Sequence, residues 1–308
     1  MMMSLMTGLA LATAAMTAPG PHGDLAGTFT DAGKGAPAVL IIPGSGPTDR
    51  DGNNPLGVTA APYRMLAEAL AAKGVSTLRI DKRGMFGSKG AIPDANAVTI
   101  ADYVTDTHQW VDALRKRTGA PCVWLLGHSE GGLVAVAAAQ QPLGLCGLIL
   151  AASPGRKLGA VIRDQLRANP ANAPILPQAL AALDSLEAGK MVDTTGMPPP
   201  LLALFSPKVQ PFMIDLLRQD PAAEVARTRL PVLIVRGGKD IQVAAADAEA
   251  LHAARPDARL VTPPTMNHVF KDVAGDDRAS NLATYADSSL PVDPALVAAV
   301  TEFVKKAR

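Results

Sequence analysis

The chain of 308 residues is 48% hydrophobic and 19% charged, which provides for a large buried core and excludes general disorder. Lys and Arg total 29 while Asp and Glu total 28, and this balance excludes the basic excess that is typical of nucleic-acid-binding proteins. Two cysteines are too few for a disulfide-rich scaffold or a cysteine-rich metal site.

The N-terminal segment differs in composition from the rest of the chain. Residues 1–23 contain no Lys, Arg, Asp or Glu, and residues 5–18 form an apolar run of the length of a signal-peptide core. This run is too short to span a bilayer, so we expect no stable membrane insertion. We predict a leader or disordered tail over residues 1–23 and a periplasmic or secreted protein. The missing positive charge at the start leaves a cytoplasmic location open.

Short, continuous apolar runs predict the strands, and such runs are typical of parallel strands buried on both faces. They lie at residues 38–42, 75–80, 122–126, 148–152, 232–235 and, more weakly, 258–261. Apolar residues at helical spacing predict helices between these strands, near residues 65–74, 100–114, 132–139, 244–253 and 294–305. This alternation predicts an α/β fold with a doubly wound, mostly parallel sheet.

One long segment interrupts the alternation. Residues 154–230 show helical periodicity and no convincing strand. We therefore predict a helical cap at 154–230, inserted between two parts of one core at 24–153 and 231–308. The apolar side chains of Phe205 and Phe212 suggest that the cap supplies an acyl pocket.

The segment Gly127-His128-Ser129-Glu130-Gly131-Gly132 follows the strand at 122–126 and opens the helix at 132–139. It is a Gly-x-Ser-x-Gly pattern in a strand–turn–helix setting, where small neighbours allow a sharp turn that exposes the serine hydroxyl. The helix N-terminus offers backbone amides to a developing negative charge. These features predict that Ser129 is a nucleophile.

A serine hydroxyl needs a base, and the base needs an acid that orients it. His268 follows the last predicted strand, which places it at the same sheet edge as Ser129. It remains as the base after the other histidines are assigned to the leader, to helices or to the turn itself, namely His22, His108, His252 and His128. Asp240 follows the strand at 232–235 and is the predicted acid, with Asp247 as its rival.

The oxyanion hole requires two backbone N–H groups. One is predicted to come from Glu130, directly after the nucleophile, and the other from the loop at 43–53 after the first core strand. Two glycines leave the backbone of this loop open, and we predict Ser45 N–H as the donor, with Gly46 N–H as the second choice.

Several motifs in this order resemble those of the α/β-hydrolase superfamily, in particular a group of bacterial serine esterases. The resemblance runs from about residue 38 to the C-terminus. It is carried by the loop at 44–53 (GSGPTDRDGN), the elbow at 127–132 (GHSEGG), and the segments at 79–84, 238–240 and 266–268. It implies an α/β-hydrolase fold and a carboxylesterase that forms an acyl-enzyme on short-chain acyl esters. Two departures stand out, since Pro43 replaces the usual histidine and only one strand candidate, at 25–30, precedes residue 38. The first strand of the usual eight is therefore expected to be absent.

No zinc site, P-loop or dinucleotide motif is present, so we expect no cofactor and no metal. The expected partner is a small-molecule ester, and the sequence does not set the oligomeric state. The same triad would serve a serine aminopeptidase or amidase, whose amine-binding acids could be Asp164, Asp184, Glu187 or Asp193. A catalytically silent binding protein on the same fold is a third alternative. Cys122 and Cys146 begin neighbouring strands, and both a disulfide and two buried thiols remain open.

Overall fold

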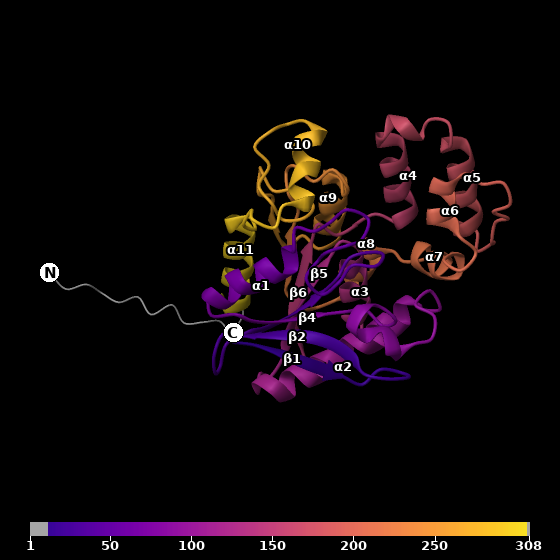
Figure 1. Ribbon diagram of the computed structural model, residues 1–308. Coiled ribbons are helices and arrows are strands. Elements are labelled where there is room, and N and C mark those ends of the chain that lie inside the picture. Colours follow the sequence, from indigo (N-terminus) through magenta and orange to yellow (C-terminus); the bar gives the residue numbers. More distant parts are fainter. Residues whose placement is uncertain (1–11, 307–308) are drawn as a thin grey trace.

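The computed structural model describes residues 12–306, and its centre is one eight-stranded sheet (Figure 1). Along the sheet the strands follow the order β1-β2-β4-β3-β5-β6-β7-β8. Their bounds are β1 (Ala12–Ala18), β2 (Leu25–Asp31), β3 (Ala38–Ile42), β4 (Ser76–Ile80), β5 (Val123–His128), β6 (Leu145–Ala151), β7 (Val232–Val235) and β8 (Arg259–Val261).

The strands β4-β3-β5-β6-β7-β8, in their order along the sheet, all pair in parallel. At one end of the sheet, β2 pairs antiparallel with both β4 and β1. The central strands β3, β4 and β5 are buried along their whole length because helices cover both faces. The predicted doubly wound α/β-hydrolase fold is thereby confirmed.

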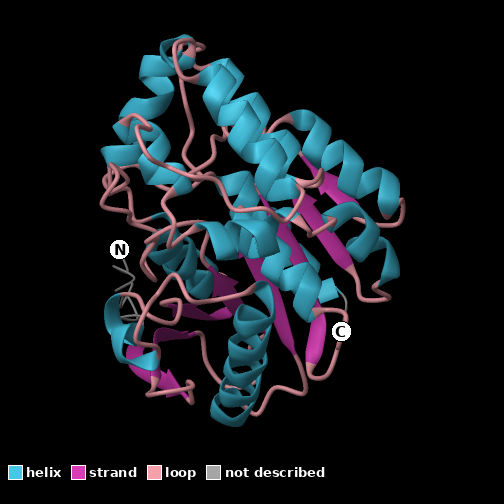
Figure 2. Ribbon diagram, turned by 90° about the vertical axis from the view of Figure 1, so that its right-hand side faces the viewer, coloured by secondary structure: helices cyan, strands magenta, loops and turns pink. Residues whose placement is uncertain are grey.

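Helices cover both faces of the sheet (Figure 2), and a hydrophobic core lies on each face. On one face, α1 (Pro62–Ala72) and α11 (Pro294–Lys306) pack on β3, β5 and β7. On the other, α2 (Ile100–Thr118) and α3 (Glu130–Ala138) cover the same central strands. The remaining helices of the C-terminal part are α9 (Ala245–Ala254) and the short α10 (Arg278–Ala283).

Five helices lie between β6 and β7, in the segment that was predicted to be helical. They are α4 (Leu158–Ala168), α5 (Leu176–Glu187), α6 (Pro199–Phe205), α7 (Gln210–Leu217) and α8 (Pro221–Arg227). The first four gather to one side of the sheet in Figure 1, and α4, α5 and α7 contact one another. Helix α8 instead packs against α3 and α9, so it joins the core.

Strand β1 corrects two expectations. The first strand of the sheet is present, and residues 12–18 pair with β2 rather than forming a disordered tail. The strand is mostly exposed, and only Ala18 is buried, so its own pattern gave little sign of a strand. The remaining apolar residues of the predicted leader, up to residue 11, lie outside the described residues. In the described part of the chain, no helix is long and apolar enough to cross a membrane.

Cys122 and Cys146 form a disulfide, which decides the alternative that the sequence left open. Their Cα atoms are 5.1 Å apart, because β5 and β6 are neighbouring parallel strands that both begin near these residues. The bridge thus lies at the amino ends of the strands, opposite the edge at which Ser129 follows β5. It closes a loop with a sequence separation of 24 residues.

We expect loss of this bridge to lower the free energy of unfolding by about 3 kcal/mol, because an uncrosslinked loop of this length gains entropy on unfolding. The measurement is urea unfolding of the wild type and of the Cys122→Ser/Cys146→Ser variant under oxidising conditions. The wild type in strong reductant is the matched control and should behave like the variant. Equal stability of oxidised wild type and variant would contradict the expectation.

Candidate active site

Ser129 occupies a strained turn between β5 and α3. Its φ of 53° and ψ of −122° are unusual for a residue with a side chain, and such conformations cost on the order of 1–3 kcal/mol. The turn is held by close backbone contacts that only glycine permits. A Cβ at Gly127 would collide with the Gly131 carbonyl, and one at Gly131 would collide with the Ile42 carbonyl. The backbone at Ser129 therefore has the sharp turn that the sequence pattern predicted.

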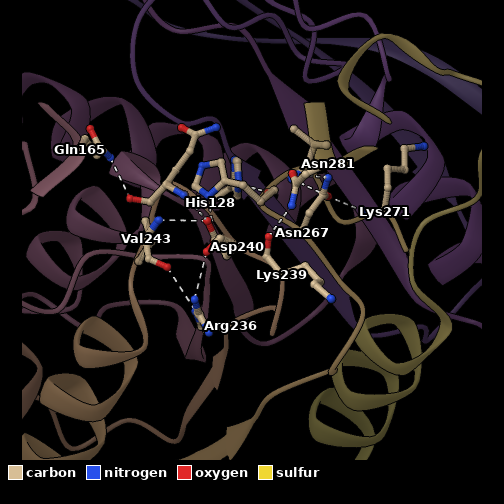
Figure 3. A network of polar contacts seen from close by, with 12 residues as sticks. His128, Gln165, Arg236, Lys239, Asp240, Val243, Asn267, Lys271 and Asn281 are labelled. Atoms are coloured by element: carbon tan, nitrogen blue, oxygen red, sulfur yellow. Dashed lines mark hydrogen bonds and ion pairs between the residues drawn. The ribbon is translucent and has the colours of Figure 1, made fainter. Parts of the chain in front are cut away.

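Asp240 and His268 form a direct hydrogen bond, with 2.9 Å between His268 Nδ1 and Asp240 Oδ2. The other carboxylate oxygen, Oδ1, accepts from the backbone amides of Gln242 at 2.8 Å and Val243 at 2.9 Å (Figure 3). Burial alone would raise the pKa of Asp240, but the charge of His268 and these hydrogen bonds outweigh it and lower the pKa. An ionised Asp240 thus fixes the orientation of the His268 ring.

The three predicted triad residues follow β5, β7 and β8, so all lie at the carboxyl edge of the parallel strands. The structure joins Asp240 to His268 directly. Within residues 12–306, no hydrogen bond links the Ser129 hydroxyl to His268. Such bonds are commonly long in the free enzyme and tighten when substrate binds.

The rival acid Asp247 has a different role. It is fully buried on α9 and accepts hydrogen bonds from the backbone amides of Gly155 and Arg156. It also pairs with the Arg156 guanidinium at 2.8 Å. Asp247 therefore anchors the chain just before α4, where the helical segment leaves the sheet.

The predicted oxyanion donors Ser45 and Glu130 both line the cavity at Ser129. The loop carrying Ser45 lies against the elbow, since a Cβ at Gly44 would be 3.3 Å from Ser129 Cβ. In the part of the chain that the structure describes, neither the Ser45 nor the Glu130 amide donates a hydrogen bond. Both N–H groups are therefore free to bind a substrate oxygen.

Lys82 is bonded to the loop at 43–53, which carries the predicted oxyanion donor Ser45, and sequence reasoning missed this contact. Its Nζ donates to the Gly44 carbonyl at 2.7 Å and lies 3.4 Å from Glu130 Oε1. The Glu130 side chain is buried in this pair. The only signal in the sequence was the position of Lys82 after β4, within the motif at 79–84.

Charged residues of the loop at 43–53 are bonded to β4 and to the residue that follows it. The Arg50 side chain donates to Asp81 at 2.9 Å through Nε, and Asp51 pairs with Arg79. Arg83 instead pairs with Asp102 and Asp106 of α2, at 2.8 and 2.7 Å. These charges brace the loop, and their partners on the protein leave them little capacity for substrate.

A cavity of about 700 Å³ extends from Ser129 between the sheet edge and the helical segment. Its wall is mainly apolar and includes side chains of α4, α6 and α7, among them Leu158, Ile162, Leu204, Phe212 and Met213. Phe212, one of the two predicted pocket residues, therefore lines this cavity. The other, Phe205, is fully buried and does not line the cavity, because its side of α6 faces the interior of the helical segment.

The four acidic residues that could bind an amine already have side-chain partners on the protein. Asp164 pairs with Arg156, and both Asp184 and Glu187 pair with Arg163. Asp193 accepts from the Thr195 hydroxyl at 2.7 Å. Among the described residues, none of these four acids lines the cavity. Nor does any cluster of three or more His, Cys, Asp or Glu side chains within residues 12–306 form a metal-binding group.

His128, the residue before the nucleophile, is buried among polar groups of the site. Its Nδ1 lies 2.6 Å from the Tyr63 hydroxyl and its Nε2 lies 2.9 Å from the His268 carbonyl oxygen. Burial and the neighbouring charge of His268 lower the pKa of His128 to about 3. Sequence reasoning set His128 aside, and no pattern in the sequence linked it to Tyr63.

Comparison with known proteins agrees with this architecture. The family described as serine aminopeptidase, S33, matches residues 56–185. Esterase EstD of Thermotoga maritima is 28% identical over 251 residues, which are 79% of this chain and 56% of EstD, so the chain spans about half of that relative.

Solved structures of other proteins share the fold. Esterase Pf2001 of Pyrococcus furiosus superposes with a TM-score of 0.57 at 16% identity, covering 96% of this chain and 93% of that one. Est1E of Butyrivibrio proteoclasticus gives a TM-score of 0.58 at 20% identity, covering 95% and 98%. These matches agree with the α/β-hydrolase fold of this chain.

The depressed pKa of His128 predicts acid-sensitive stability. The unfolded chain binds a proton at this histidine below about pH 6.5, whereas the folded protein does so only near pH 3, so acidification in this window favours unfolding. Between pH 6.5 and 5 the wild type should lose about 2 kcal/mol more stability than His128→Gln, which cannot titrate there. Urea unfolding at several pH values checks this. Parallel pH profiles of the two proteins would contradict it.

Proposed function

We propose that this protein is a serine carboxylic ester hydrolase that acts through an acyl-enzyme. The observation that carries the proposal is the Asp240–His268 hydrogen bond, at the sheet edge where Ser129 occupies its strained turn beside the cavity. A serine, a histidine oriented by a buried carboxylate, and two unoccupied amides are the groups that acyl transfer requires.

In the proposed reaction, the Ser129 hydroxyl attacks the ester carbonyl carbon and His268 Nε2 takes the hydroxyl proton. The carbonyl oxygen becomes negatively charged and is bound by Ser45 N–H and Glu130 N–H. When the intermediate collapses, His268 gives its proton to the leaving alcohol, and an acyl-enzyme remains. His268 then activates a water molecule, which releases the carboxylic acid and restores Ser129.

The apolar cavity supports an ester with a hydrocarbon acyl group as substrate. We propose short-chain acyl esters, with the acyl chain against Phe212 and its neighbours on α7. The proposal agrees with EstD, which is an esterase by name and which this chain resembles over 251 residues.

A serine aminopeptidase or amidase is the second candidate, favoured by the family match over residues 56–185. The lining of the cavity speaks against it. Glu130 is the acidic side chain that the described lining offers for a free amine, and it is paired with Lys82. A silent binding protein would not need the ordered Asp240–His268 pair.

We also propose that the protein is exported. Disulfides persist in oxidising compartments, and the Cys122–Cys146 bridge therefore supports export.

Ser129→Ala should lower kcat at least 10⁴-fold, roughly the loss seen when a triad member is removed, because the only activated nucleophile is gone. The measurement is hydrolysis of a panel of nitrophenyl acyl esters beside aminoacyl nitroanilides. Ser185→Ala, at a half-buried serine on α5 that does not line the cavity, is the matched control and should keep wild-type rates. A variant that retained a tenth of the activity would exclude this serine as nucleophile, and a preference for nitroanilides would favour the aminopeptidase.

Phe212→Ala should shift the preferred acyl chain to greater length, because it enlarges the apolar cavity, and each added methylene is worth about 1 kcal/mol or roughly a fivefold change in kcat/KM. The rates of the nitrophenyl ester series, from acetate upward, give this profile. Phe205→Leu is the matched control, since Phe205 is buried away from the cavity. It should lower the melting temperature and leave the profile unchanged. The assignment of Phe212 fails if its own profile keeps the wild-type shape.

A further inference from the structure

Tyr63 and His128 form a polar chain that connects three loops of the site. The Gly44 amide donates to the Tyr63 hydroxyl at 3.1 Å, the hydroxyl lies 2.6 Å from His128 Nδ1, and His128 Nε2 lies 2.9 Å from the His268 carbonyl oxygen. Gly44 belongs to the loop after β3, His128 ends β5, and His268 lies in the loop after β8. Both side chains are buried, so water does not compete for these bonds.

The direction of each hydrogen bond follows from the chemistry of the groups. A carbonyl oxygen only accepts, so His128 Nε2 must carry a hydrogen and donate it to His268. A neutral histidine then has a bare Nδ1, which only accepts, so the Tyr63 hydroxyl donates to it. The hydroxyl oxygen in turn accepts from Gly44 N–H. The Tyr63 hydroxyl donates once and accepts once, and each ring nitrogen of His128 has one partner, so no alternative arrangement satisfies all of these groups.

Burial keeps the two titratable groups in these forms. It is the main reason why the pKa of His128 is low and the pKa of Tyr63 is raised. The charges of Asp240, Glu130 and Asp49 act on the pair, Lys82 lies beside it on the Gly44 carbonyl, and His268 also faces His128, with 4.7 Å between the ring centres. His128 lies beside the Asp240 network in Figure 3.

We propose that Tyr63 and His128 are positioning residues, which hold the loop at 43–53 and the main chain of His268 in fixed positions around Ser129. The inference rests on the proposed function, because it assigns Ser45 N–H to the oxyanion hole. Ser45 directly follows the anchored Gly44, and Ser129 directly follows His128. A shift of either loop would therefore move an oxyanion donor or the base relative to the nucleophile.

The test is Tyr63→Phe, which keeps the ring but leaves Gly44 N–H without an acceptor and His128 Nδ1 without a donor. We expect kcat for a nitrophenyl acyl ester to fall roughly ten- to hundredfold with KM nearly unchanged, because misplacement of an oxyanion donor weakens the transition state more than the ground state. Rates are expressed per active site, titrated with a phosphonate ester that reacts with the nucleophilic serine.

A trifluoromethyl ketone separates positioning from a purely structural role. Its adduct with the serine carries an oxyanion, so its affinity should fall by the same factor as kcat in Tyr63→Phe. Thr118→Val is the matched control, since it also loses a hydrogen-bonded hydroxyl, here 2.7 Å from the Leu114 carbonyl oxygen in α2, and neither residue lines the cavity. It should keep kcat and ketone affinity. If Tyr63→Phe only lowers the melting temperature and keeps kcat per active site within twofold, the inference is overturned.

A double-variant cycle tests whether the two residues act as one chain. Tyr63→Phe/His128→Leu should lose no more activity than the more damaging single variant, because either change breaks the same link. If the activity losses of the two single variants multiply in the double variant, the two residues do not act as one chain. If His128→Leu does not fold, the ketone affinity of Tyr63→Phe decides whether the positioning role holds. The two proposals fail separately: an active Ser129→Ala counts against the esterase mechanism, whereas a fully active Tyr63→Phe beside an inactive Ser129→Ala counts against the positioning role alone.

Discussion

The close approach of three backbone segments at Ser129 is the constraint on which the rest of the site depends. The elbow, the end of β3 and the first turn of α3 come together so closely that Gly127 and Gly131 cannot carry a side chain. The unfavourable backbone conformation of Ser129 persists because β5 and α3 are fixed by the sheet and by the core on either side of it. All other groups of the site are placed relative to this turn. The loop at 43–53 approaches it at Gly44, and His128 is hydrogen-bonded to the main chain of His268.

Charged and polar anchors help to hold the loops at this edge. Asp51 is bound to Arg79, Lys82 to the Gly44 carbonyl, and Asp247 to the chain before α4. Such buried ionic contacts add little net stability, but breaking one leaves a charge without a partner in a poorly solvated place. A loop that is fixed in this way has one low-energy position. This suits a site in which the nucleophile, the base and the oxyanion donors come from separate loops.

The sequence was sufficient for most parallel strands, because β3, β5, β6 and β7 are nearly continuous apolar runs, and for placing Ser129, Asp240 and His268 at one sheet edge, because each follows a predicted strand. Strand β1 escaped prediction because its residues are small and mostly exposed, and its pairing with β2 is what makes it a strand. Phe205 and Phe212 look alike in sequence, and only the packing of α6 and α7 decides which one faces the cavity. Tyr63 and His128 are 65 residues apart, and nothing local indicates their contact.

The position of the disulfide has a consequence for how the chain is built during synthesis. The bridge spans only β5, α3 and β6, so both cysteines leave the ribosome well before the residues of β7 and β8 exist. Closing a loop of this length costs little entropy compared with the long-range pairings that follow. The turn that bears Ser129 therefore lies in a segment that is synthesised early, whereas the proposed acid and base arrive with the last quarter of the polypeptide. A nascent chain would thus carry its nucleophile in place, yet without the groups that activate it, until synthesis is nearly complete.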